Sequence, residues 1–435
     1  MTGVVSAAPG ARGTAADRRA RVAAAGAYFV QGLCFAALIT QVPALQHRFG
    51  FTDAELSLVL LAVPVVAGLG SVLAGTLARR FGSAVLLRAG GLGVAAAITA
   101  AGAVGTRPGL YAVLAAVGLF LGLVDATMNM QGVAVQRRYG RSLLASFHGV
   151  WSVGGIAGAL ATAAAGRLHL SLLAGLASVA LAGAAISLAA GPSLLRRTQE
   201  TATAPAPDPA VSLGSVASPE TAVESGSAAA PGSVAASGSA AAPGTGAAPV
   251  IPWLPIIAVG SAMMLMYIAD SATQNWGTIY LERMHPAAGV APLGLAAYQT
   301  CMVLGRAIGD RAVARFGPVR SVAAGGAVGV AGLLLVAAAP GPAVAIAGFA
   351  VLGLGLCVVV PQSFSAAGAL DPTGSGVAIA RVNLFNYAGF VIGAALIGIV
   401  AENATLRWAF AVPAVLTAGI VALARSFRPR PVSPP

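Results

Sequence analysis

The chain is built from apolar blocks long enough to cross a lipid bilayer. Of its 435 residues, 57% are hydrophobic and only 9% are charged, whereas a soluble domain carries about 25% charged residues. A membrane-spanning helix needs about 20 consecutive apolar residues. Twelve such blocks occur in two groups of six: 22–44, 54–78, 84–104, 109–136, 143–166 and 169–190, then 253–282, 292–314, 319–339, 342–366, 376–400 and 406–425.

These blocks predict an all-α membrane protein with twelve transmembrane helices in two six-helix bundles. The segment between the bundles is rich in Ala, Pro, Gly and Ser, and repeats the octet SGSAAAPG at 225–232 and 237–244. Such a composition cannot bury a core and favours a flexible linker. The predicted organisation is a tail (1–21), a first bundle (22–191), a linker (192–250), a second bundle (251–425) and a second tail (426–435).

The basic residues are distributed as membrane topology signals. All 25 are arginine, and they fall at intervals between apolar blocks rather than in one patch, which argues against nucleic-acid binding. Two lie inside predicted spans (Arg306 and Arg381), and 18 lie on the side that holds both termini. This asymmetry predicts cytoplasmic termini, and the first block is expected to be an uncleaved span. The other five lie on the opposite side: Arg48, Arg107, Arg167, Arg283 and Arg407.

The residues that usually build catalytic or metal sites are scattered. Cys34, Cys301 and Cys357 lie far apart within apolar blocks, and their spacing matches neither a disulfide framework nor a metal site. The four histidines are likewise dispersed over different regions. We therefore predict no enzyme activity, no cofactor and no metal.

The two halves repeat each other. The stretch GSVLAGTLARRFG (Gly70–Gly82) aligns without gaps on GRAIGDRAVARFG (Gly305–Gly317), and the same offset places His148 opposite Asn383 and Ser146 opposite Arg381. Two six-span units in the same orientation are related by an axis along the membrane normal, and the substrate of such folds lies at the bundle interface near the midplane.

This Gly- and Arg-rich loop resembles the signature loop of the major facilitator superfamily. Asp310 matches the acid of that pattern, whereas the first-half equivalent is Gly75. The stretches LVDATMNMQGVAVQRRYGRSLLASFHGVWSVGG and DSATQNWGTIYL resemble the fucose-permease-like branch of bacterial transporters. The resemblance implies a monomer in the bacterial cytoplasmic membrane and a cytoplasmic gate, with gating residues Asp310, Arg306, Arg311, Arg315, Arg79 and Arg80.

Two carboxylates lie inside the apolar blocks. Asp125 is twelve residues before Arg137, roughly 18 Å along a helix, which places it near the midplane of the bilayer. Asn129 follows one turn later on the same face. Asp270 is the acid of the seventh block, with Gln274, Asn275 and Trp276 close behind it. An intramembrane acid either carries a proton or locks the bundle through a hydrogen bond, and both interpretations stay open for each acid.

The fifth and eleventh blocks carry two further ionisable groups. His148 could relay a proton or be a hydrogen-bonded core residue. Arg381 stays charged, so it must meet Asp125, Asp270, the substrate or Asp371, or extend to the cytoplasm. The proton-coupling candidates are thus Asp125, Asp270 and His148. The substrate-binding candidates are Asn129, Gln31, Gln274, Asn275, Trp276, Arg381, Asn383 and Asn386.

These features predict a secondary active transporter of a small polar organic solute, sugar-like or another metabolite, that works by proton-coupled symport. Its expected partners are the solute, protons and the lipid bilayer. The main alternative is a proton antiporter that exports a drug-like compound or a metabolite, and a non-transporting membrane sensor is a distant one. Solute entry under an inward proton gradient would indicate symport, and accelerated exit would indicate antiport.

Overall fold

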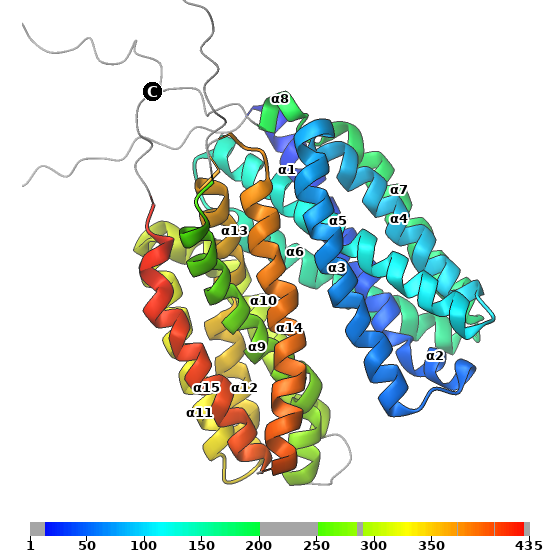
Figure 1. Ribbon diagram of the computed structural model, residues 1–435, viewed down its shortest axis with the longest axis vertical. Helices are drawn as coiled ribbons and strands as arrows, with labels where there is room; N and C mark the ends of the chain where they lie inside the picture. Colours follow the sequence, from blue (N-terminus) through cyan, green and yellow to red (C-terminus); the bar gives the residue numbers. More distant parts are fainter. Residues whose placement is uncertain (1–13, 201–250, 285–289, 372, 404, 430–435) are drawn as a thin grey trace, which may run out of the picture. The chain divides into compact units, whose positions relative to one another are not determined.

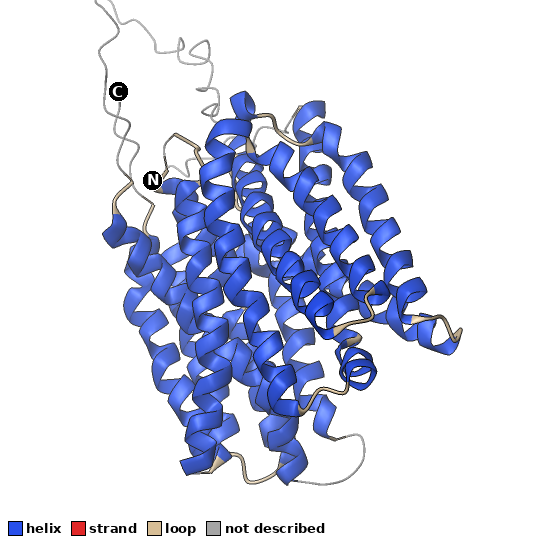
Figure 2. Ribbon diagram, turned by 45° about the vertical axis from the view of Figure 1, so that its right-hand side comes forward, coloured by secondary structure: helices blue, strands red, loops and turns tan. Residues whose placement is uncertain are grey.

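The computed structural model describes residues 14–200, 251–284, 290–371, 373–403 and 405–429, and every regular element in these ranges is a helix (Figure 2). Figure 1 shows the helices of the two halves, from blue to green and from green to red. The first half contains α1 (Ala15–Thr40), α2 (Val42–Phe49), α3 (Asp53–Phe81), α4 (Ser83–Ala103), α5 (Arg107–Tyr139), α6 (Leu144–Arg167), α7 (Leu172–Ala190) and α8 (Arg197–Glu200). The second half contains α9 (Trp253–Met284), α10 (Ala291–Phe316), α11 (Pro318–Ala338), α12 (Pro342–Leu356), α13 (Val359–Ala369), α14 (Val377–Asn403) and α15 (Leu406–Leu423).

The helices match the predicted spans in number and order. Within the described ranges, eleven helical segments are long and apolar enough to cross a membrane, with α12 and α13 counted as one segment. The twelfth predicted span is α10, a helix of 26 residues whose second half carries Arg306, Asp310, Arg311 and Arg315. These four charges belong to the repeated loop motif. They lower the mean hydropathy of α10, but the helix is still long enough to cross a membrane. The predicted all-α membrane fold is confirmed.

The two halves pack in the same pattern. In the first, α1 packs on α6 and α3 on α5; in the second, α9 packs on α14 and α10 on α12. Glycines make the closest contacts at repeat-equivalent positions. A Cβ at Gly154 would lie 2.1 Å from the carbonyl oxygen of Phe29, and a Cβ at Gly389 would lie 2.4 Å from that of Met264. Only glycine allows backbones to approach this closely, so the repeat found in the sequence is also a repeat in packing.

The first helix begins earlier than the apolar pattern predicts. It starts at Ala15 because Thr14 and Asp17 form a capping box: the Asp17 amide donates to Thr14 Oγ1 (3.1 Å), and the Thr14 amide donates to the Asp17 carboxylate (2.9 Å). Arg138 at the end of α5 pairs with the same carboxylate. The polar first turn is therefore ordered by a cap and an ion pair rather than by apolar burial.

The beginning of the predicted linker packs on the first bundle. Glu200 in α8 is buried, and its carboxylate accepts hydrogen bonds from Ser83 Oγ (3.0 Å) and from Gln131 Nε2 (3.0 Å). The Ser83 amide at the start of α4 also points to it (3.4 Å), where the preceding Gly82 offers no side-chain cap. Glu200 thus caps α4 from outside that helix. The rest of the predicted linker, 201–250, lies outside the described residues.

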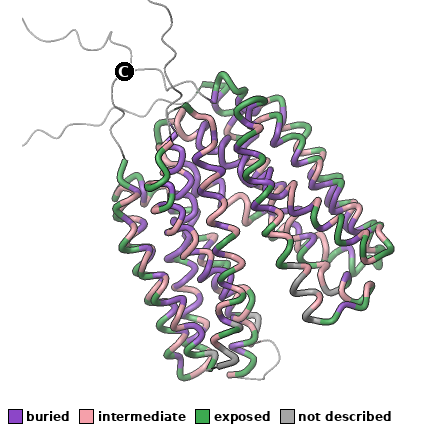
Figure 3. Tube along the Cα trace, in the orientation of Figure 1, coloured by how far each residue is buried: buried purple, intermediate pink, exposed green. Residues whose placement is uncertain are grey.

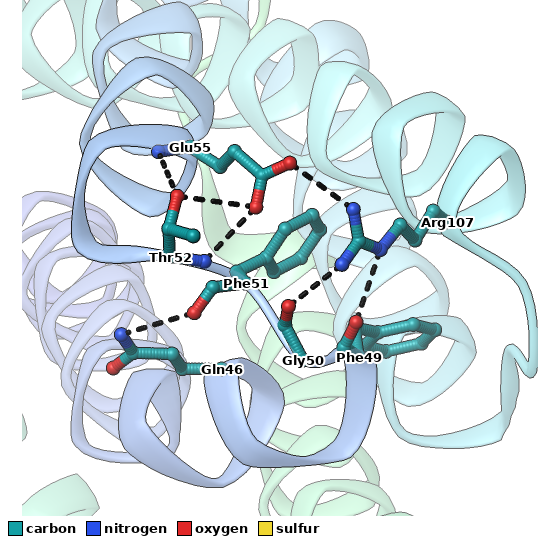
Figure 4. Close-up of polar contacts among 7 residues, drawn as sticks. All are labelled: Gln46, Phe49, Gly50, Phe51, Thr52, Glu55 and Arg107. Carbon is teal, nitrogen blue, oxygen red and sulfur yellow. Dashed lines mark hydrogen bonds and ion pairs between the residues drawn. The ribbon is translucent and has the colours of Figure 1, made fainter.

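The helix ends form two opposite faces. We call the ends that carry α8, the start of α1 and the end of α15 the α8 face, and the opposite ends, with α2, the α2 face. On the α2 face, Arg107 holds the turn after α2 (Figure 4): it donates to the carbonyl oxygens of Phe49 (3.0 Å) and Gly50 (2.7 Å) and pairs with Glu55 (3.2 Å). These bonds join α2, α3 and α5. Arg107, one of the arginines predicted on the outer side, therefore has a structural role.

The Glu200 contact predicts a pH-dependent stability. Burial raises the pKa of the Glu200 carboxyl above 4.5, although hydrogen bonds from Ser83, the Ala84 amide and Gln131 oppose the shift. Between pH 4.5 and the raised pKa, the folded protein binds more protons than the unfolded chain, so the free energy of unfolding falls as pH rises. The slope is at most about 1.4 kcal/mol per pH unit. In Glu200→Gln this part of the slope should vanish, as measured by thermal unfolding of the purified protein at several pH values.

The matched control is Glu282→Gln, which changes an exposed carboxylate at the end of α9. It should leave the wild-type slope intact. An unaltered slope in Glu200→Gln would contradict the assignment.

Candidate functional site

The two bundles are joined by hydrogen bonds on the α8 side of the molecule. Among the described residues, every hydrogen bond between the bundles lies between the middle of the helices and the α8 face. The deepest are made by Asp125 and Arg306, and the outermost by Asp310 and Arg137. The middle of α5 is buried without interruption over residues 121–135 (Figure 3). The contact surface therefore closes the α8 side of the interface.

Asp310 caps a helix of the opposite bundle. Its carboxylate accepts hydrogen bonds from Ser142 Oγ (2.8 Å), the Ala145 amide (3.1 Å), and the amide (2.9 Å) and hydroxyl of Ser146. These groups form the N-terminus of α6, whose own N-cap residue, Leu143, provides no side-chain bond. A carboxylate is the preferred partner of such free amides. Asp310 can thus hold the bundles together, and its gating role stays a prediction.

The repeat-equivalent contact has a different chemistry. A Cβ at Gly75 would lie 2.7 Å from the Cβ of Ala380, the second-half counterpart of Ala145, so the missing acid leaves direct helix packing. The N-terminus of α14 is instead bonded by Asp371 of its own bundle, which accepts from the Gly376 amide (2.8 Å). Arg137 of the first bundle donates to the carbonyl oxygen of Asp371 (3.0 Å).

The other predicted gating residues fall into two groups. Arg306 is buried and lies deeper than the loop, with Nη1 donating to Ser152 Oγ of the first bundle (2.7 Å). The remaining four are all exposed on the α8 face, and none of them makes a hydrogen bond to the opposite bundle within the described residues. They are Arg79, Arg80, Arg311 and Arg315.

Asp125 sits at the centre of a network that spans both bundles. Its carboxylate accepts from Tyr387 Oη (2.9 Å) and Asn386 Nδ2 (3.2 Å) of the second bundle, and from Asn129 Nδ2 (3.4 Å) of its own helix. Tyr28 Oη donates to Asn129 Oδ1 (2.7 Å). Among the described residues, Asp125 has no ion-pair partner. The structure therefore brings the predicted residues Asp125, Asn129 and Asn386 into one cluster.

The network continues towards α3. Asn383 Oδ1 accepts from Asn386 (3.3 Å), and Asn383 Nδ2 donates to Ser71 Oγ of the first bundle (3.3 Å). Two hydroxyl donors, Tyr28 and Tyr387, were not predicted as partners of this cluster. Their signal in the sequence was weak, because aromatic residues are common in membrane helices for packing alone.

Asp270 is satisfied within its own bundle. Its carboxylate accepts from Gln274 Nε2 (2.6 Å) and from Tyr298 Oη. Asn275 donates to the carbonyl oxygen of Ser271 (2.8 Å), and so does not contact the acid. Trp276 donates to the carbonyl oxygen of Ala394 on α14 (3.2 Å).

Gln31, one of the predicted substrate-binding residues, accepts a hydrogen bond from Trp151 Nε1 inside the first bundle.

His148 lies between aromatic rings from both bundles. Tyr28 meets it edge-on at 5.2 Å, and Phe364 of α13 stacks on it at 6.0 Å. Among the described residues, nothing bonds to its Nε2.

Arg381 meets none of the three acids predicted for it. Its guanidinium stacks on the Trp253 ring (4.2 Å) and donates to the carbonyl oxygen of Ile251 (3.2 Å). An aromatic face and a free carbonyl at the start of α9 satisfy the charge there, and no acid is required.

Comparison with known proteins identifies the family. The sequence model of the Major Facilitator Superfamily matches residues 24–367 and 258–435. The chain belongs to the Major Facilitator Superfamily. An uncharacterised MFS-type transporter of Yersinia pestis is 27% identical over 404 residues, which cover 92% of this chain and 94% of the relative.

Solved structures share the fold of this transporter. The crystal structure of the MFS transporter FucP in the outward conformation has a TM-score of 0.70 at 16% identity, covering 94% of this chain and 98% of FucP. The human organic anion transporter MFSD10 (TETRAN) also has a TM-score of 0.70, at 14% identity, covering 94% and 99%. FucP of E. coli is described as a fucose:proton symporter. One fold therefore serves solutes of different charge, and the solute must be argued from the site.

The family confirms several predictions at once. The chain is a multi-pass membrane transporter of the superfamily and not an enzyme. Members of this superfamily carry small solutes. Family membership does not identify the solute, the coupling ion or the residues that bind them, so these must be inferred from the contacts of the site.

The Asp310 contact predicts a measurable gate. In Asp310→Asn, the amide retains one acceptor oxygen and turns an NH₂ group towards the α6 amides, which costs about 1–2 kcal/mol of bundle contact. A cysteine introduced at Val133, which packs on Gly368 of the opposite bundle, should react with N-ethylmaleimide roughly tenfold faster in this variant. Both proteins would carry serine at the three native cysteine positions.

Arg320→Gln, on an exposed side chain of the same bundle, is the control and should leave the labelling rate unchanged. Equal rates in Asp310→Asn and its parent would exclude Asp310 from closure of the α8 face.

Proposed function

We propose that the chain is a secondary active transporter that moves a small polar organic solute across the bacterial cytoplasmic membrane, with proton coupling by symport. It works as a monomer by alternating access, with the solute at the bundle interface. The observation that carries this proposal is the position of Asp125. It is a buried carboxylate of one bundle, and two of its hydrogen-bond donors, Asn386 and Tyr387, belong to the other.

This position couples a proton to the movement of the bundles. When the bundles rock apart on the α8 side, Asp125 loses the Asn386 and Tyr387 donors but keeps Asn129. Hydrogen bonds to a carboxylate change its proton affinity, so the affinity of Asp125 for a proton differs between the two states. A proton that binds one state better shifts the equilibrium between them, which is the requirement for coupling.

The orientation follows from the arginines. The α8 face carries the start of α1, the end of α15 and most of the described arginines, so the positive-inside rule favours a cytoplasmic position for this face. Because the bundle contacts lie on that face, we propose that the structure represents an outward-facing state. Asp310, the Arg137 contact and the Gly75–Ala380 packing would then form the closed cytoplasmic gate.

The roles proposed for the remaining site residues follow their positions. Asp270 and His148 are the further proton-coupling candidates, since both are buried, and His148 also stacks on a ring of the opposite bundle. The polar groups proposed to contact the solute are Gln31, Asn129, Gln274, Asn275, Trp276, Arg381, Asn383 and Asn386.

The proposal predicts a split phenotype for Asp125→Asn. Solutes would first be screened on the purified protein by thermal stabilisation with sugars, polyols and small carboxylic acids. In proteoliposomes, an inward proton gradient should drive uptake of the best binder by the wild type, and at least tenfold less by Asp125→Asn. Counterflow exchange of the same solute should persist in the variant, because exchange needs no net proton movement.

Thr99→Ala, which changes a hydroxyl bonded to its own helix in α4, is a control expected to keep both activities. Loss of both activities in Asp125→Asn, with the protein still folded, would contradict the coupling role. Faster exit of solute under the inward proton gradient would identify antiport instead.

A further inference from the structure

Arg306 is a buried cation in the interface between the bundles. Its residue is 7% exposed, and it lies ten residues before the end of α10, about 15 Å from the α8 face. Its Nη1 donates to Ser152 Oγ of α6 (2.7 Å), and Gly149 of the same helix lies beside it: a Cβ at Gly149 would be in ordinary van der Waals contact with the Arg306 Cβ, at 3.8 Å. Arg306 is thus part of the contact between α10 and α6.

This cation lacks a direct counter-ion. Among the described residues, the ion pairs within 4.0 Å are those of Arg107 with Glu55 and Arg138 with Asp17. Asp270 acts on Arg306 through space only. A buried charge without a close partner is costly. We therefore expect a bound ligand to supply the negative charge that Arg306 lacks.

Two buried nitrogens in this region have no hydrogen-bond partner among the described residues. They are Nε of Arg306 and Nε2 of His148, whose residue is 6% exposed. The two side chains come from the facing helices α10 and α6, and Ser152, which accepts from Arg306, donates to the carbonyl oxygen of His148 one turn away (3.2 Å). Each unmade bond costs about 1–3 kcal/mol. When His148 carries its proton on Nε2, both nitrogens are donors, and a single ligand that brings acceptor atoms satisfies them together.

The chemistry of these groups selects the ligand. A guanidinium has five N–H donors and no acceptor, and it pairs with planar carboxylates through two parallel bonds. A polyol would offer hydroxyl groups but would leave the charge uncompensated. A phosphate dianion would bring a second negative charge near Asp270. A single carboxylate therefore suits this site better than either.

We propose that Arg306 and His148 form an anion-binding subsite, and that the transported solute is a small organic carboxylate. This inference rests on the proposed transport function and names the solute class for it. His148, one of the groups proposed to carry the proton, is itself part of this subsite.

The test compares acetate with acetamide, which has nearly the same shape and no charge. The full-length protein is unfolded thermally with up to 100 mM sodium acetate, acetamide or sodium chloride. Acetate should raise the melting temperature with concentration, and the other two should not. D-gluconate and D-glucitol, which differ only in one carboxylate, form a second pair, and gluconate alone should stabilise the protein. Equal responses within both pairs, or no response to either acid, would overturn the proposal.

Variants locate the site. Arg306→Gln should weaken the acetate response at least tenfold, Arg306→Lys should weaken it less because the charge remains, and Arg320→Gln should leave it unchanged. An undiminished response in Arg306→Gln would place the anion elsewhere and refute the assignment. If Arg306→Gln does not fold, the response of Arg306→Lys and the two ligand pairs measured on the wild type still test the proposal.

Transport separates this inference from the proposed function. Proton-driven accumulation of glucitol without binding of gluconate would retain the transporter and reject the carboxylate site. Binding of gluconate to the wild type but not to Arg306→Gln, without any gradient-driven movement of gluconate, would retain the site and reject proton-coupled transport.

Discussion

The structure depends on the cost of placing ionisable groups inside a membrane. A charge at the bilayer centre is expensive, and in this chain Asp125, Asp270, Arg306 and His148 are all more than nine-tenths buried. Asp125, Arg306 and His148 contact the opposite bundle directly, whereas Asp270 is bonded within its own. The ionisable groups at this contact are proposed to serve transport, and their burial depends on the second bundle. Separation of the bundles changes their surroundings directly.

The duplicated fold closes its α8 side with two unlike contacts. Asp310 binds the N-terminus of α6 with a charge, whereas its counterpart Gly75 lets α3 and α14 pack directly. Arg137 compensates by holding the loop carbonyls that precede α14. The charged cap depends on hydrogen-bond geometry, whereas the Gly75–Ala380 contact depends on close packing alone. The two sides of the closure therefore need not open in the same way or at the same cost.

The fold was predictable because its causes are local in the sequence. Apolar length gave the spans, arginines gave the alternation of sides, and the ungapped repeat gave the equivalence later seen in the packing of Gly154 and Gly389. Of the residues that surround Asp125, the sequence predicted only the asparagines. Its Tyr28 and Tyr387 partners come from helices far apart in the chain, and no periodicity pairs such residues. Arg381 shows the same limit, since stacking on Trp253 removed the need for the acid that the charge suggested.

The two acids differ in what they can sense. Asp270 has both of its donors, Gln274 and Tyr298, in its own bundle, so a rigid-body rotation of the bundles leaves its hydrogen bonds intact. Asp125 has donors in both bundles, so the same rotation changes its surroundings. The structure thus separates two carboxylates for which the sequence left the same two interpretations open. Asp125 is placed to report the conformational state, and Asp270, within electrostatic reach of Arg306, is placed to respond to what occupies the site.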